Sequence, residues 1–166
     1  MAGKADFTPD DWKTLLESVM MAGLAVTAAD PSGLWGTLKE SMATARAVIG
    51  AKHDANATEL IKALASEFET GEGRATARDG LRAQLSGKTP SEIVTKSLEI
   101  LKQAASIVVA KAPADAPAFK GWLQHISEAV AKASIEGGFL GFGGVQISDA
   151  EKATLAHISE ALGLAT

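Results

Sequence analysis

Helix start signals recur along this chain, and they constrain its fold more than any other feature of the sequence. The first lies at residues 7–12, "FTPDDW". Thr8 suits an N-cap, Pro9 the first helical position and Asp11 the third position, while Phe7 and Trp12 occupy the two staple positions around the cap. The stretch therefore predicts a helix that begins at Pro9.

Three further stretches repeat the spacing of a capping box, a polar cap followed three residues later by an acid. The pairs are Asn56–Glu59, Thr89–Glu92 and Ser148–Glu151. Strict alternation of apolar and polar residues is almost absent, so strands are not expected. Together these patterns predict seven helical segments, at about 9–29, 32–52, 57–69, 74–85, 90–111, 115–136 and 148–162.

The fold class that follows is all-α, a single compact bundle of six or seven helices. Links between the segments are mostly short, as between antiparallel neighbours. In the second segment Leu34, Trp35, Leu38 and Met42, with Val48 or Ile49, are expected to face inward. One domain is expected over residues 1–166, with a flexible N-terminus at 1–7 and a Gly/Phe-rich loop at 137–147.

Charge and cysteine content exclude several classes of function. The formal net charge is -4, which offers no basic footprint for nucleic acid. The chain has no cysteine, so disulfides, thiolate nucleophiles and cysteine-based metal sites are excluded. No export signal is visible, and the longest apolar run, 19–29, is about half a bilayer span. We therefore expect a cytoplasmic protein with no membrane span.

The loop at 137–147 concentrates glycines and aromatic residues. It does not match a phosphate-binding loop, which needs a lysine after its glycines or a strand before them. The simplest interpretation is a sharp connection in which Phe139, Leu140 and Phe142 turn into the bundle. Exposed, the same residues would bind a partner or insert into a membrane interface. A further alternative is a divalent metal site that uses Glu136, Asp149 and Glu151.

Arginines at positions 74, 78 and 82 share one face of the fourth segment. Like charges at this spacing repel one another weakly, and guanidinium groups suit carboxylate or phosphate partners. Arg74, Arg78 and Arg82 are therefore candidates for an anion site. The alternative is neutralisation by nearby acids, with Asp79 three residues before Arg82 and with Glu67, Glu69 and Glu72 arriving from the preceding segment. Gly73 and Gly80 suggest that this segment is mobile.

No catalytic set emerges from the remaining polar residues. His53, His125 and His157 lack the spacing of a zinc site, and we expect them at the edges of their helices. The serines match no nucleophile motif. The sequence thus predicts no enzyme activity and no cofactor.

Two stretches carry a resemblance to known proteins. The opening "FTPDDWKTLLESVMMAGLAVTAADPSGLWG" and the ending "GGFLGFGGVQISDAEKATLAHISEALG" resemble a family of small, uncharacterised bacterial proteins. The ending is also similar to TerB-like tellurite-resistance domains. Those helical domains place acidic residues around a turn for a suspected metal, whereas here the turn is Gly-Gly.

The function expected from these observations is that of a non-enzymatic binding or interaction protein. Trp35, Phe139, Leu140 and Phe142 are the expected contact residues, for a protein partner or for self-association as a homodimer. The alternative is a domain that binds a small ligand, an anion or a divalent metal.

Overall fold

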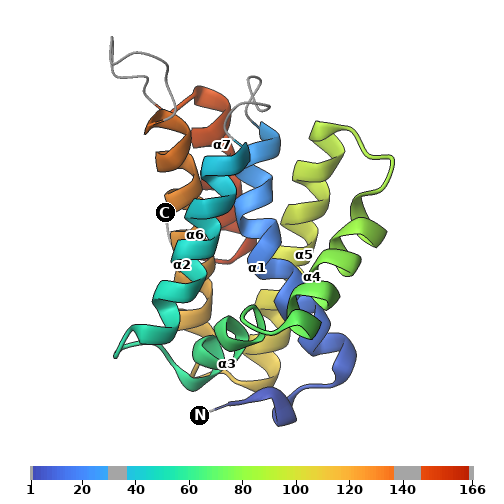
Figure 1. The fold of residues 1–166 in the computed structure, drawn as a ribbon, viewed down its shortest axis with the longest axis vertical. Coiled ribbons are helices and arrows are strands. Elements are labelled where there is room, and N and C mark those ends of the chain that lie inside the picture. The colour runs from blue at the N-terminus through green and yellow to red at the C-terminus, as the bar shows by residue number, and fades with distance from the viewer. Residues whose placement is uncertain (1, 30–36, 137–146, 165–166) are drawn as a thin grey trace.

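The described part of the chain consists mainly of helices. The computed structural model describes residues 2–29, 37–136 and 147–164. In chain order the elements are η1 (Lys4–Asp6), α1 (Pro9–Ala29), α2 (Thr37–His53), α3 (Glu59–Glu67), α4 (Gly71–Leu85), α5 (Pro90–Lys111), α6 (Ala116–Glu136) and α7 (Asp149–Ala161) (Figure 1). These ranges contain no strand, so the prediction of an all-α bundle is confirmed.

The central helix of the bundle is α1 (Figure 1). It packs most extensively on α5 and α6, and it also contacts α4, α7 and α2. Leu15, Val19, Ala22 and Val26 are all buried along it. Because neighbouring helices cover several faces of α1, its apolar residues are needed on several faces and not along one stripe.

The predicted caps of α1, α5 and α7 are present. Thr8 and Asp11 bond reciprocally at the start of α1, where the Asp11 backbone N–H donates to Thr8 Oγ1 over 3.2 Å and the Thr8 N–H donates to Asp11 Oδ2 over 3.1 Å. The rings of Phe7 and Trp12 lie 5.9 Å apart, as the staple predicts. Thr89–Glu92 and Ser148–Glu151 form complete capping boxes.

The predicted cap of the third helix is wrong. Thr58, not Asn56, is the N-cap, and its hydroxyl accepts from the Ile61 N–H. The Asn56 N–H instead donates to Asp54 Oδ1 over 2.8 Å. The residue therefore closes a local turn before the helix, which is a common alternative use of such side chains.

The start of the fourth helix also differs from the prediction. The helix begins at Gly71 and not near Arg74, because Thr70 caps it by accepting from the Gly73 N–H over 2.9 Å. A Cβ on Gly73 would lie 2.2 Å from the carbonyl oxygen of Glu67. The glycine therefore allows the first turn of α4 to pack against the end of α3.

Residues 2–7, for which the sequence predicts a flexible N-terminus, lie against the bundle. Phe7 is buried, and the Ala2 N–H donates to the buried carboxylate of Asp115 over 3.1 Å. Lys4 pairs with Glu67 over 2.6 Å. These contacts join the N-terminal segment to the start of α6 and to the end of α3.

Candidate binding groove

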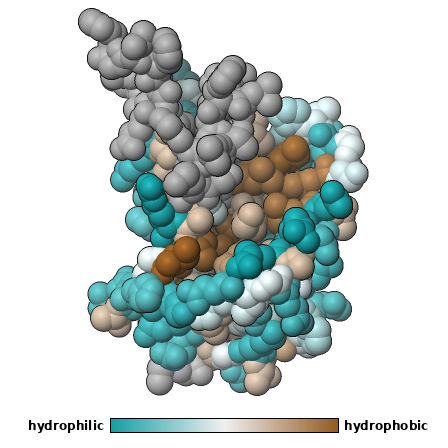
Figure 2. Space-filling model, in the orientation of Figure 1, coloured by the Kyte–Doolittle hydropathy of each residue, from teal (hydrophilic) through white to brown (hydrophobic). Residues whose placement is uncertain are grey.

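A groove opens between α1, α2 and α4, and we call it the α1–α2–α4 groove. Its apolar side chains come from these helices and from the residue after α3: Met20, Leu24, Val48, Ile49, Phe68 and Leu81. The cavity has a volume of about 490 Å³, within the range of small-molecule sites. Figure 2 shows hydrophobic residues gathered in the hollow of this face, with hydrophilic residues along its edges.

The groove exists because α2 and α4 both pack on α1 but make few contacts with each other within the described residues. Small residues set the floor. Gly23 is buried, and a Cβ added to it would lie 2.6 Å from Thr44 Oγ1. At this point α1 and α2 therefore touch, whereas α4 lies apart from α2 across the groove. Ala77 of α4 is also buried and lines the same space.

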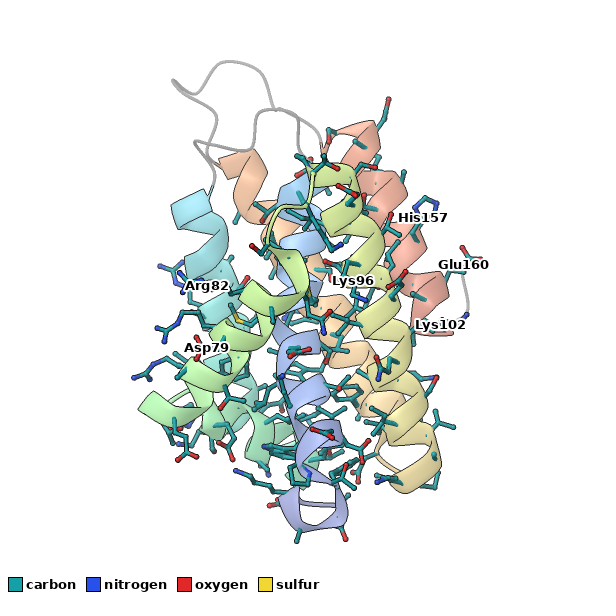
Figure 3. The ribbon with its side chains drawn as sticks, turned by 90° about the vertical axis from the view of Figure 1, so that its right-hand side faces the viewer. Asp79, Arg82, Lys96, Lys102, His157 and Glu160 are labelled. Carbon is teal, nitrogen blue, oxygen red and sulfur yellow. The ribbon has the colours of Figure 1, made fainter. Side chains whose placement is uncertain are left out.

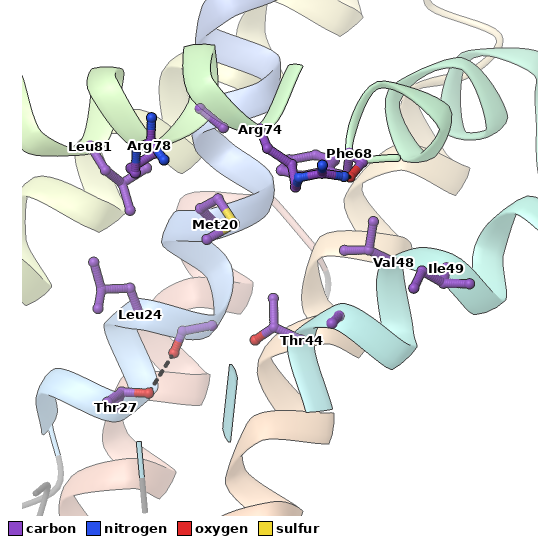
Figure 4. A pocket seen from close by; sticks show the side chains of 13 residues that line it. Met20, Leu24, Thr27, Thr44, Val48, Ile49, Phe68, Arg74, Arg78 and Leu81 are labelled. Atoms are coloured by element: carbon purple, nitrogen blue, oxygen red, sulfur yellow. Dashed lines mark hydrogen bonds between the residues drawn. The ribbon is translucent and has the colours of Figure 1, made fainter. Parts of the chain in front are cut away.

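One wall residue of α2 carries exposed apolar surface. Ile49 is 48% exposed, whereas its neighbour Val48 is 3% exposed. The sequence leaves open which of the two side chains faces inward, and in the structure the buried one is Val48. Both side chains line the groove opposite α4 (Figure 4). An uncovered isoleucine at the edge of an apolar hollow provides additional surface for a ligand.

The polar side chains that line the groove come from two threonines and two arginines. The Thr27 hydroxyl donates to the Gly23 carbonyl over 3.4 Å, and the bond appears in Figure 4. Arg74 and Arg78 project from α4, on the side of the groove that faces Met20 and Leu24 of α1. The groove thus has an apolar body and a cationic edge.

Arg74 is held in place by the end of α3. Its Nη1 donates to the carbonyl oxygens of Phe68 and Glu69, both over 2.9 Å. Phe68 is the C-cap of α3 and Glu69 follows it, so these carbonyls lie where the helix ends and acceptors without an intrahelical partner need donors. The guanidinium group at this edge of the groove is therefore oriented by the protein before any ligand arrives.

The predicted neutralisation of the arginine face is different in the structure. Asp79 pairs with Arg78, Nε to Oδ1 over 3.5 Å, and not with Arg82. Glu67 pairs with Lys4, and Glu69 pairs with Lys52. Side-chain direction and neighbouring helices decide these pairs, and neither follows from sequence spacing.

Of the three predicted anion-binding arginines, the structure brings two to the groove. Arg74 and Arg78 line it, whereas Arg82 lies one turn further along and does not. Figure 3 shows Arg82 and Asp79 on the outer side of α4. The fourth arginine of the chain, Arg46, is exposed on α2. All four arginines therefore belong to the two helices that flank the groove.

A buried carboxylate lies beneath α4, beside the groove. Glu17 of α1 is 3% exposed; its Oε1 accepts no hydrogen bond among the described residues, and the Lys13 ammonium forms an ion pair with it at the longer distance of 3.8 Å. Burial raises the pKa of this carboxyl group, and the charges of Lys13 and Lys96 partly offset the rise. A Cβ on Gly80 would lie 2.1 Å from Oε1. The carboxylate therefore occupies the space that the glycine leaves open.

The predicted contact residues of the loops lie outside the described residues. These are Trp35, Phe139, Leu140 and Phe142. The side chain of Glu136, one of the three predicted metal ligands, also lies outside them. Asp149 is exposed, and Glu151 is buried, accepting from the Ser148 N–H and hydroxyl over 2.8 Å each. No group of three or more potential metal-ligating side chains is found within residues 2–29, 43–133 and 147–164.

The histidines are exposed, as helix-edge positions predict. His53 ends α2, His125 lies on α6 and His157 lies on α7. They belong to three different helices, and none of them lines the groove.

None of the helices that the structure describes is long and apolar enough to cross a membrane. This agrees with the expectation from the length of the apolar run at 19–29.

Comparisons of the chain with protein-family models, with curated proteins and with solved structures give no match. The resemblances to a bacterial family and to TerB-like domains therefore stay predictions.

Proposed function

We propose that the chain is a non-enzymatic helical binding protein and that the α1–α2–α4 groove is its binding site. The observation that carries the proposal is an apolar cavity of about 490 Å³ with an oriented arginine at its edge. Sites for small molecules typically combine an apolar lining with a few convergent polar groups. A cytoplasmic location is part of the proposal.

The lining favours binding over catalysis. Its polar side chains, among the described residues, are Thr27, Thr44, Arg74 and Arg78. The Thr27 hydroxyl is bonded to its own helix, and Arg74 caps α3. Neither pairs with a carboxylate or imidazole in the lining that could act as a general base. The alternative in which Arg74 and Arg78 bind an anion uses the same groove.

The test measures binding of a neutral hydrophobic dye, Nile red, by fluorescence titration. Ala45 is exposed and lines the groove on α2, so Ala45→Phe fills the space without disturbing the core. Ala110→Phe places the same side chain at an exposed position on α5, away from the groove. We expect saturable binding, and we expect Ala45→Phe to weaken it by about tenfold or more. The added phenyl ring covers apolar groove surface that the dye would otherwise contact, and losing that contact changes the affinity on this scale.

Two outcomes of this titration would overturn the proposal. One is the absence of saturable dye binding to the folded protein. The other is an equal effect of Ala45→Phe and Ala110→Phe, because a dye that binds the groove must distinguish the two variants. Thermal denaturation of each variant verifies that both are folded.

Self-association is a separate part of the proposal, and its support is the sequence of the loops. Phe139 and Phe142 lie among glycines, and exposed aromatic residues are common contact residues at interfaces. Sedimentation velocity over a wide concentration range is expected to show a dimer that Phe139→Ser together with Phe142→Ser weakens. A monomer at every concentration would exclude this part without affecting the groove.

A further inference from the structure

We propose that the α1–α2–α4 groove binds a single-chain amphiphile with an anionic head group, of the class of linear alkyl carboxylates. This inference rests on the proposed function and specifies the ligand. The alkyl chain occupies the apolar groove, and the carboxylate pairs with Arg78 at its edge.

The dimensions of the groove suit a narrow, linear ligand. On α1 its lining runs from Met20 to Thr27, and on α4 it runs from Arg74 to Leu81. Each stretch advances seven residues, about 10 Å at the rise of an α-helix. A helix with side chains is itself about 10–12 Å wide. A partner helix would therefore need far more space than the cavity of about 490 Å³ offers. A single alkyl chain is thinner and can enter between the two walls.

The small residues of the floor favour the same shape. Gly23 and Ala77 give depth, while longer side chains such as Leu24 and Leu81 form the walls. Ile49 extends the apolar surface out of the hollow. A ligand that covers both the floor and Ile49 needs a continuous apolar chain, which a compact anion such as free phosphate lacks.

The charge of the groove edge determines the sign of the head group. The chain as a whole carries a formal charge of -4, yet its four arginines lie on the two flanking helices. The Nη atoms of Arg78 have no protein partner among the described residues, because the contact to Asp79 uses Nε. A guanidinium group binds a carboxylate through two parallel hydrogen bonds, which fits this free end of the fork. The oriented Arg74 adds a second positive charge on the same side.

The test compares three ligands that share one chain length: decanoate, 1-decanol and decyltrimethylammonium. Each is titrated below its micelle concentration, and binding is measured by displacement of Nile red. We expect decanoate to bind about tenfold more tightly than the other two, the factor expected for one charge-assisted hydrogen bond. Butyrate, which has the same head group on a short chain, is expected not to compete.

The arginines provide a matched pair of variants. Arg78→Gln removes the guanidinium group that lines the groove, and Arg82→Gln removes one that does not. Both positions are exposed on α4, so both variants keep the core. Arg78→Gln is expected to abolish the preference for decanoate over decanol, whereas Arg82→Gln is expected to preserve it. Arg74 is left intact because it also caps α3.

Several outcomes would overturn the inference while the proposed function survives. If Nile red binds the groove but decanoate and decanol bind equally, the anionic head group is wrong. If Arg82→Gln acts as strongly as Arg78→Gln, the preference is diffuse electrostatics and not a site. If the protein sediments with phosphatidylglycerol vesicles but binds no monomeric decanoate, the ligand is a lipid surface. If an acidic amphipathic helical peptide displaces the dye and decanoate does not, the occupant is a partner helix.

Discussion

Gly80 and Glu17 meet where α4 packs on α1, and their contact can be tested by a double-mutant cycle. A Cβ at position 80 would lie 2.1 Å from Glu17 Oε1 and 2.8 Å from its Cγ, so Gly80→Ala forces the carboxylate to move. We expect Gly80→Ala to destabilise the parent protein. In the Glu17→Ala background it is expected to stabilise by about 0.5–1 kcal/mol, the usual gain of alanine over glycine in a helix.

The cycle is measured by urea denaturation of the four proteins. For side chains in direct contact, we expect a coupling free energy between the two substitutions of more than about 0.5 kcal/mol. The same free-energy change for Gly80→Ala in both backgrounds would show that the two residues do not share this space.

The buried Glu17 carboxyl group also predicts a pH dependence of stability. Its pKa is raised from 4.5 by burial, so the native state binds the proton more tightly than the unfolded chain. The stabilisation from this group is therefore complete below about pH 4.5 and is lost as the pH rises through the raised value. Glu17→Gln is expected to remove this loss, and its stability relative to the parent protein should increase from pH 4 to pH 7.

Urea denaturation at several pH values between 4 and 7 measures the difference. Glu160→Gln, at an exposed position on α7, is the control for removing a carboxylate that is not buried. If the difference between Glu17→Gln and the parent protein is constant over this range, the carboxylate is not buried in the native state.

At the residue scale the sequence does not indicate what the glycines of the fourth helix contact. The mobility that Gly73 and Gly80 suggest stays a prediction, whereas the structure places both glycines against neighbouring groups. A glycine that permits a close approach and a glycine that loosens a helix look alike in one sequence. The difference depends on Glu67 and Glu17, which approach from other elements.

At the scale of the helix, the capping box of α7 has a measurable value. Ser148 Oγ accepts from the Glu151 N–H over 3.1 Å, which satisfies one of the orphan donors of the first turn. Ser148→Ala is expected to lower the free energy of unfolding by about 1 kcal/mol. Ser106→Ala, in the interior of α5, is the matched control, because alanine is a slightly better helix former there. Equal effects in chemical denaturation would show that the cap does not contribute.

Helix boundaries could be predicted where the signal is local. Thr8, Thr89 and Ser148 act on donors within three residues, so their roles follow from spacing alone. The prediction fails at Asn56, since Thr58 competes for the same helix start and Asn56 bonds to Asp54. It fails again at α4, because glycines at positions 71 and 73 mask the cap at Thr70.

At the scale of the molecule, the groove could not be predicted because its walls lie far apart in the sequence. Residues 20–27, 44–49 and 74–81 meet only when α2 and α4 both pack on α1. The arginine periodicity does predict a cationic face on the fourth helix. Which of its residues reach an apolar cavity depends on the packing of three helices, and the spacing of residues along the sequence does not predict that packing.

The same packing predicts that stability is uneven across the bundle. α4 fully buries only small residues, namely Gly73, Ala77 and Gly80. α1 buries large ones, including Leu15, Leu16 and Val19. Since little apolar area holds α4 in place, it should open without global unfolding. In native-state hydrogen exchange, we expect the amides of α4 to exchange faster than those of α1. We also expect the opening free energy of α4 to change less with denaturant concentration.

Ligand binding should then act most strongly on this helix. α4 forms one wall of the groove, so a ligand that needs both walls binds only the closed form and slows the opening of α4. Amides near Val108 of α5, which does not line the groove, serve as the internal control and should change little. A single exchange free energy shared by α1 and α4 in the free protein would contradict this prediction, because the bundle would then open as one unit.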